Sequence, residues 1–195
     1  MSFITGTSAE LIYASINAGT AKATFTSEAQ INDTSGMGVQ AVLPPRFFLP
    51  QGRSQGQAIK IVGRGIVSST GTPTFTWSVR LGAAGNTTTA QVGATAALTT
   101  TSGAASQPWH FELDVVCQTP GADGANTTVR GTGFIYCFGG LAAGQNCGVF
   151  GGGASPGTVS IDTSISNFIN FNAACGTSNG SNSITLQQLF VYGLN

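Results

Sequence analysis

The sequence predicts an all-β protein, an antiparallel β-sandwich of jelly-roll-like form with an extended N-terminal arm. In residues 73–82, PTFTWSVRLG, the apolar residues Phe75, Trp77, Val79 and Leu81 alternate with polar ones, which is typical of a half-buried strand. Similar segments recur about every ten residues between turns rich in glycine, serine, threonine and proline. No segment keeps helical apolar spacing over three turns.

The expected strands follow from this alternation and from the turn clusters between them. In chain order they are residues 22–31, 57–68, 73–82, 87–98, 109–118, 127–138, 157–164, 166–174 and 183–193. Residues 8–16, SAELIYASI, fit either an opening strand or a short helical turn. Paired glycines inside two of the strands, such as Gly63 and Gly65, predict a close neighbour or a bend at those points.

The N-terminal third has a different pattern. Residues 32–56 carry three prolines, which favour an extended path outside a central strand. We expect residues 1–56 to form an arm and an opening strand, and residues 57–195 to form the sandwich, together in one domain. The arm's anchoring residues would be Leu43, Arg46, Phe47, Phe48 and Leu49. Two interpretations stay open: a flap that packs on its own core, or an arm that reaches a neighbouring subunit.

Composition restricts the function more than any motif does. Of the 195 residues, 7% are charged, against about 25% in an ordinary soluble domain. Such a surface suits an extracellular protein or one whose surface is largely covered by neighbours.

The sequence also argues against nucleic-acid and membrane partners. Seven basic residues balance seven acidic ones, so the basic footprint of a nucleic-acid binder is absent. No apolar run approaches the roughly 20 residues of a membrane span. The N-terminus lacks the pattern of a signal peptide, so we expect synthesis in a cytoplasm.

The strongest cluster of titratable residues is His110, Glu112 and Asp114, which share the outward face of one predicted strand. We favour cross-strand ion pairs with outward arginines over a metal site or an acid–base pair. Those arginines are Arg64, Arg80 and Arg130. The sequence therefore predicts no enzyme, no catalytic residue and no metal site.

The glycine-rich stretches at 121–126 and 139–153 lack the lysine of a P-loop and the spacing of a dinucleotide site, so we expect no cofactor. Cys117 fits a buried thiol, and the spacing of the four cysteines is not that of a metal site. Cys137 and Cys147 flank a glycine-rich loop and lie where a disulfide is conceivable. Cytoplasmic synthesis favours free thiols.

Several phrases of the chain resemble a group of small virion proteins of tailed bacteriophages. They are IKIVGRGIVSSTGTPTFTWSVRLG at 59–82, PWHFELDVVCQT at 108–119, VRGTGFIYC at 129–137 and SNSITLQQLFVYGLN at 181–195, with AELIYASI and DTSGMGVQAVLPPRFFLP near the N-terminus. The resemblance implies a non-enzymatic jelly-roll protein of the decoration, cement, head-fibre or tail type. It further implies a homo-oligomer, with a trimer favoured, that binds capsid or tail proteins in the virion after synthesis in the bacterial host. No site motif transfers with it.

The alternative is a tail or receptor-binding module that binds carbohydrate. Its aromatic candidates are Trp109, Tyr136 and Tyr192, although Trp109 is in phase with core residues. Tyr136 shares one face of its strand with Phe134 and Phe138. These three side chains form the predicted contact patch.

Overall fold

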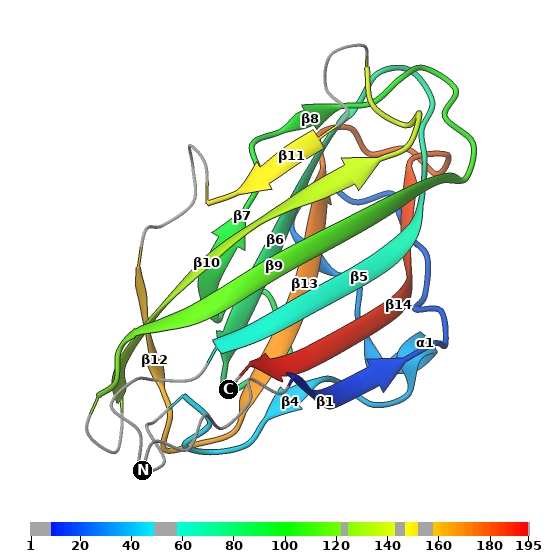
Figure 1. Cartoon of the computed structure of the whole chain (residues 1–195). Helices are drawn as coiled ribbons and strands as arrows, with labels where there is room; N and C mark the ends of the chain where they lie inside the picture. The colour runs from blue at the N-terminus through cyan, green and yellow to red at the C-terminus, as the bar shows by residue number, and fades with distance from the viewer. Residues whose placement is uncertain (1–8, 49–57, 122–124, 143–146, 152–157, 195) are drawn as a thin grey trace.

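Two antiparallel sheets packed face to face make up the protein, which confirms the predicted β-sandwich (Figure 1). The computed structural model describes residues 9–48, 58–121, 125–142, 147–151 and 158–194. Sheet A contains β1 (Ala9–Ser15), β2 (Lys22–Ala23), β5 (Ala58–Ser68), β9 (Gln107–Thr119), β10 (Ala125–Cys137), β11 (Cys147–Phe150), β12 (Val159–Asp162) and β14 (Ser183–Leu194). Sheet B contains β3 (Ala29–Gln30), β4 (Val42–Leu43), β6 (Thr74–Gly82), β7 (Ala90–Ala94), β8 (Leu98–Thr99) and β13 (Asn167–Cys175).

The strand order is that of a jelly roll. In sheet A the order β1-β14-β5-β9 faces the order β3-β13-β6-β7 in sheet B. The chain crosses repeatedly from one sheet to the other, which produces two nested Greek keys. Beyond β9, strand β10 widens sheet A, and β11 and β12 pair with opposite halves of its far edge (Figure 1). The long strands β5, β9 and β10 therefore present a broad outer face.

Aromatic residues from both sheets fill the core. Trp77 and Val79 of β6 and Phe111 and Leu113 of β9 are fully buried, as their alternation predicts. The rings of Phe111 in sheet A and Phe171 in sheet B stack with centroids 4.1 Å apart. Burial of such large apolar side chains between the sheets is the main force that holds them together.

The paired glycines of β5 make room for this core. A Cβ atom at Gly63 would collide with the ring of Phe111, and one at Gly65 would collide with Trp109 and with the carbonyl oxygen of Thr185. The close neighbour that we expected at these positions is therefore an aromatic ring of the adjacent strand.

The N-terminal region is part of the sandwich rather than a separate arm in its described residues. β1 pairs with β14, so residues 9–15 form an opening strand. β4 pairs with β13, and the side chains of Leu43 and Phe48 are buried in the core. Phe47 packs partly buried against that core, and the Arg46 backbone N–H donates a hydrogen bond to the Thr163 carbonyl oxygen (2.6 Å). Leu49 lies outside the described residues.

This placement corrects the prediction of a partner-anchoring arm for two of its residues. Leu43 and Phe48 are not available to a partner, because they already fill this protein's own core.

The predicted strand 22–31 is interrupted: it forms only the short strands β2 and β3, in different sheets. The four-residue helix α1 (Thr34–Met37) follows β3. Among the described residues, no helix has the length and hydropathy to cross a membrane.

Candidate functional site

The outer face of sheet A carries a row of exposed aromatic side chains on β10 and directly after it. Phe134, Tyr136 and Phe138 are 37%, 42% and 58% exposed, and Val149 of β11, opposite Phe134, is 59% exposed. The ring centroids of Phe134 and Tyr136 are 5.8 Å apart, and those of Tyr136 and Phe138 are 6.0 Å apart, with the latter pair nearly parallel. We call these four residues the aromatic strip. Alternation along one strand places its three rings on the same face, as the sequence predicts.

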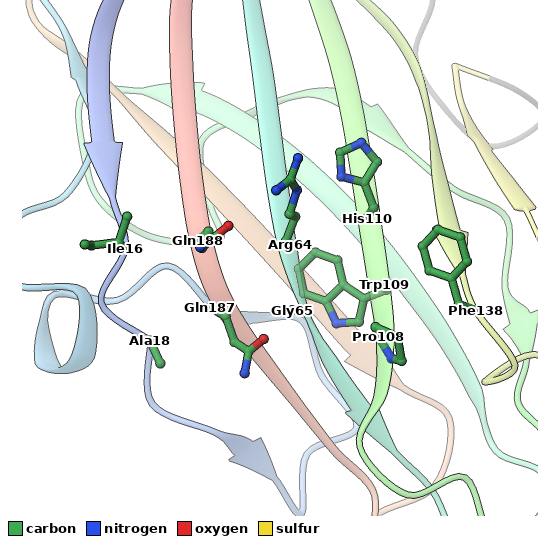
Figure 2. A pocket seen from close by; sticks show the side chains of 10 residues that line it. All are labelled: Ile16, Ala18, Arg64, Gly65, Pro108, Trp109, His110, Phe138, Gln187 and Gln188. Atoms are coloured by element: carbon green, nitrogen blue, oxygen red, sulfur yellow. The ribbon is translucent and has the colours of Figure 1, made fainter.

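A hollow of about 700 Å³ lies next to the strip and shares Phe138 with it (Figure 2). Strands β5, β9 and β14 and the segments after β1 and β10 supply its lining. The lining residues are Ile16, Ala18, Arg64, Gly65, Pro108, Trp109, His110, Phe138, Gln187 and Gln188. The hollow thus combines apolar walls with a guanidinium, an imidazole and two amides.

An irregularity in β14 positions the two amides. The register of β14 against β5 shifts between Leu186 and Gln188, as in a β-bulge, so Gln187 is an extra residue. Both glutamines line the hollow as a result, although a regular strand would send neighbouring side chains to opposite faces. The bulge therefore adds a polar group to the outer face.

Charged residues beside the strip form one ion-paired cluster. Lys60 Nζ lies 2.7 Å from Glu112 Oε2, and His110 Nε2 lies 3.2 Å from Glu112 Oε1. The hydrogen bond from Lys60, followed by that from His110, lowers the pKa of Glu112. The same bond to Glu112 raises the pKa of Lys60. This carboxylate is therefore engaged within the sheet.

Cross-strand ion pairs with outward arginines were the favoured prediction for these residues. Glu112 does pair across strands, but its partner is Lys60 and not a predicted arginine. The pairing expected for Arg80 was wrong. β6 belongs to sheet B, so Arg80 lies on the opposite outer face and pairs with Glu28 instead. Within the described residues, no group of three or more histidine, cysteine, aspartate or glutamate side chains is arranged to hold a metal ion.

The outer face of sheet B is closed by a polar network around Glu28. Arg80 Nε and Nη2 donate hydrogen bonds to the two carboxylate oxygens of Glu28 over 2.9 and 2.7 Å, and Ser78 Oγ donates another. Asn172 Nδ2 donates to Glu28 Oε1 over 3.2 Å. Burial alone would raise the pKa of Glu28, but the hydrogen bonds from Arg80 and Ser78 and the charge of Arg80 lower it.

Neighbouring amides extend this network over the same sheet. Asn170 is fully buried, and its Nδ2 donates to the Ala84 carbonyl oxygen (2.9 Å) and to Thr89 Oγ1 (3.1 Å). Its Oδ1 accepts a hydrogen bond from Gln40 Nε2 over 2.5 Å. Glu28, Arg80 and Asn170 on this face are thus bonded to the protein's own strands and loops, whereas Asn172 Oδ1 is buried without a hydrogen-bond partner among the described residues.

The remaining candidates fall in different places. Trp109 is buried and forms part of the floor of the hollow, whereas Tyr192 is half-buried on β14 and stacks on Phe190.

All four cysteines are free thiols, so the Cys137–Cys147 bridge is not formed. Cys137 faces the core, where burial, followed by the charge of Cys147, raises the pKa of its thiol to about 12. Cys147 is exposed opposite Tyr136. Cys117 is half-buried and packs against the core.

Sequence reasoning missed Arg64, Gln187 and Gln188 as parts of one site. A signal for the glutamines exists in the sequence. The apolar alternation of β14 runs through Ile184 and Leu186 and then resumes at Leu189 and Val191. This slip of one residue marks the bulge.

No protein-family model and no curated protein matches the sequence. Among solved structures, the chain is similar to the CBM2 module of the evolved Dit of Lactobacillus casei BL23 phage J-1. The TM-score is 0.37 and the identity 11%, over 97% of each chain. It is also similar to peanut lectin solved with a 9mer peptide, with a TM-score of 0.31 and 8% identity over 100% of this chain and 94% of the lectin. At these TM-scores neither likeness assigns a family or a ligand.

Proposed function

We propose that this protein is a non-enzymatic carbohydrate-binding component of a tailed-phage virion, and that it binds saccharide on the outer face of sheet A. The observation that carries the proposal is the aromatic strip directly beside a hollow with polar side chains. The virion assignment rests on the phrases that resemble phage virion proteins and on the low content of charged residues.

A saccharide suits this surface for chemical reasons. One side of a pyranose ring presents C–H groups that stack on an aromatic ring, and its edge presents hydroxyl groups that need hydrogen-bond partners. Tyr136 and Phe138 provide adjacent, nearly parallel rings. Gln187, Gln188 and Arg64 provide planar donors, and the amide oxygens provide acceptors. Ligand sites typically combine apolar walls with a few placed polar groups in this way.

A glycan microarray tests the proposal. The wild-type protein should bind a set of related glycans, and Tyr136→Ala and Phe138→Ala should weaken that binding about tenfold each. Tyr192→Ala is the matched control, because Tyr192 stacks on Phe190 away from the strip on the same sheet. An array without hits, or equal losses in the three variants, would overturn the proposal.

A second candidate function is a structural subunit of the virion, a decoration, cement or head-fibre protein that forms a symmetric oligomer, with a trimer favoured. The observation that favours it is the exposure of Phe134 and Val149 on neighbouring strands at the margin of sheet A. Exposed apolar patches of this kind also mark protein–protein contacts. Light scattering separates the candidates: a subunit contact predicts an oligomer that Val149→Ser dissociates, whereas a glycan site leaves the mass unchanged.

A further inference from the structure

Arg64 is the charged residue of the hollow whose role the fold does not explain. It lies on the outer face of β5, directly opposite His110 of β9 and Gln188 of β14. Figure 2 shows its guanidinium beside the imidazole of His110, above the floor formed by Trp109. Lys60, the lysine on the same face of β5, differs from it because it is paired with Glu112.

Among the described residues, no carboxylate forms an ion pair with Arg64. Within the described residues, no aspartate or glutamate lies within 4.0 Å of its guanidinium, and no carboxylate lines the hollow. Glu112, the acidic residue one step along β9, already accepts from Lys60 and His110. The hollow therefore has a net positive charge and an array of N–H donors.

The positive charge of the hollow favours an anionic ligand, and its apolar walls favour a ligand that also has an apolar surface. Phe138 and Ile16, which are 58% and 74% exposed, stand with Pro108 and Ala18 around the charged group. A small inorganic anion would leave these walls in contact with water. A volume of about 700 Å³ is within the range of pockets that hold ring-sized organic ligands.

We propose that the hollow binds an acidic saccharide unit, with Arg64 holding its carboxylate or phosphate group and Phe138 packing against its ring. This inference rests on the proposed carbohydrate binding and specifies its ligand class. A guanidinium matches either anion through paired N–H donors, so both groups are candidates for the same position. Gln187 and Gln188 then bond the ring hydroxyls.

The experiment compares matched sugars by NMR titration of the full chain. Glucose and glucuronate differ at C6 by a carboxylate, and glucose 6-phosphate places a phosphate there. We expect at least one acidic sugar to bind about tenfold more tightly than glucose, and the preference to fall as salt rises. The stronger of the two identifies the anion.

Two arginine variants assign the effect. Arg64→Gln should remove the preference for the acidic sugar, so that acidic and neutral sugars bind the variant with equal affinity. Arg130→Gln is the control, because Arg130 is also exposed on sheet A, opposite Val116 and outside the hollow. Arg64→Lys should keep part of the preference, since it retains the charge without the paired donors.

Each outcome decides a different claim. Equal affinities for glucose and both acidic sugars, or equal losses in Arg64→Gln and Arg130→Gln, would overturn the acidic-saccharide proposal while carbohydrate binding stands. Acetate or inorganic phosphate binding as tightly as the sugars would also overturn it, because the site would then recognise an anion only. If no sugar binds here and the microarray gives no hits, both proposals fail.

Discussion

The outer faces of the two sheets use their polar residues in opposite ways. On sheet B, Arg80 donates hydrogen bonds to Glu28. Asn170 is fully buried and donates a hydrogen bond to a nearby loop. On sheet A, Tyr136 and Phe138 are exposed and Arg64 faces a hollow. Groups satisfied within the protein stabilise the fold, whereas exposed rings and an unmatched cation are available to a ligand. The contrast supports the proposal that sheet A carries the binding face, while the polar groups of sheet B serve the fold.

Breaking the network on sheet B should have the largest effect on stability. Glu28→Gln removes the charge that Arg80 contacts through two hydrogen bonds, and should lower the free energy of unfolding by about 2 kcal/mol. Denaturant unfolding measures this quantity. The matched change on sheet A, Arg64→Gln, should cost less than about 0.5 kcal/mol. Equal costs on the two sheets would remove the distinction between them.

Truncating the aromatic strip should have the reverse effect. Phe138→Ala should weaken saccharide binding about tenfold, because the ring that packs against the sugar is lost. Its free energy of unfolding should stay within about 0.5 kcal/mol of the wild type, since Phe138 is 58% exposed. Binding and unfolding measured on one preparation check both parts. A marked loss of stability would mean that the strip supports the fold.

Acid should affect the sheet B network through Glu28. The pKa of this carboxyl lies below its ordinary value of 4.5 in the folded protein, so its ionised form stabilises the fold at neutral pH. That contribution is lost as the pH falls from about 4.5 through the lower folded-state pKa. The difference in unfolding free energy between wild type and Glu28→Gln should therefore narrow between pH 7 and pH 3. Other carboxyls are common to both proteins and cancel. A constant difference would contradict the ion pair.

Thiol labelling gives the smallest and most local comparison. Cys147 is exposed beside Tyr136, whereas Cys137 is buried with a thiol pKa raised to about 12. A maleimide should therefore modify Cys147 much faster than Cys137 in the native protein, because the thiolate is the reactive form. Mass spectrometry of the labelled peptides measures the ratio. A bulky label on Cys147 should also reduce saccharide binding, and Cys147→Ser should prevent this.

The strands were largely predictable because their pattern is local. Alternation of Phe75, Trp77, Val79 and Leu81 fixes which side of β6 is buried without knowledge of its neighbours. The three rings of the aromatic strip were found for the same reason, since Phe134 and Tyr136 lie on β10 and Phe138 directly follows it. Val149 on the neighbouring strand β11 was not predicted. Pairing between strands is not local. Arg80 was therefore expected to pair with Glu112 or Asp114, whereas it pairs with Glu28.

The hollow was missed because three strands and two connecting segments build it. Arg64, His110 and Gln188 are adjacent only through the order β14-β5-β9. The burial of Leu43 and Phe48 depends likewise on β4 pairing with β13, far along the chain. Proline content alone predicts an extended path for that segment but not what it packs against.

The central claim is that ligand binds to the outer face of sheet A and not to that of sheet B. Chemical-shift mapping on the isotope-labelled protein, with the saccharide that the microarray selects, tests it most directly. The claim predicts shift changes at Arg64, His110, Tyr136 and Gln188, with none at Glu28, Arg80 or Asn170. Changes centred on the sheet B residues, or none on sheet A at saturating saccharide, would contradict it.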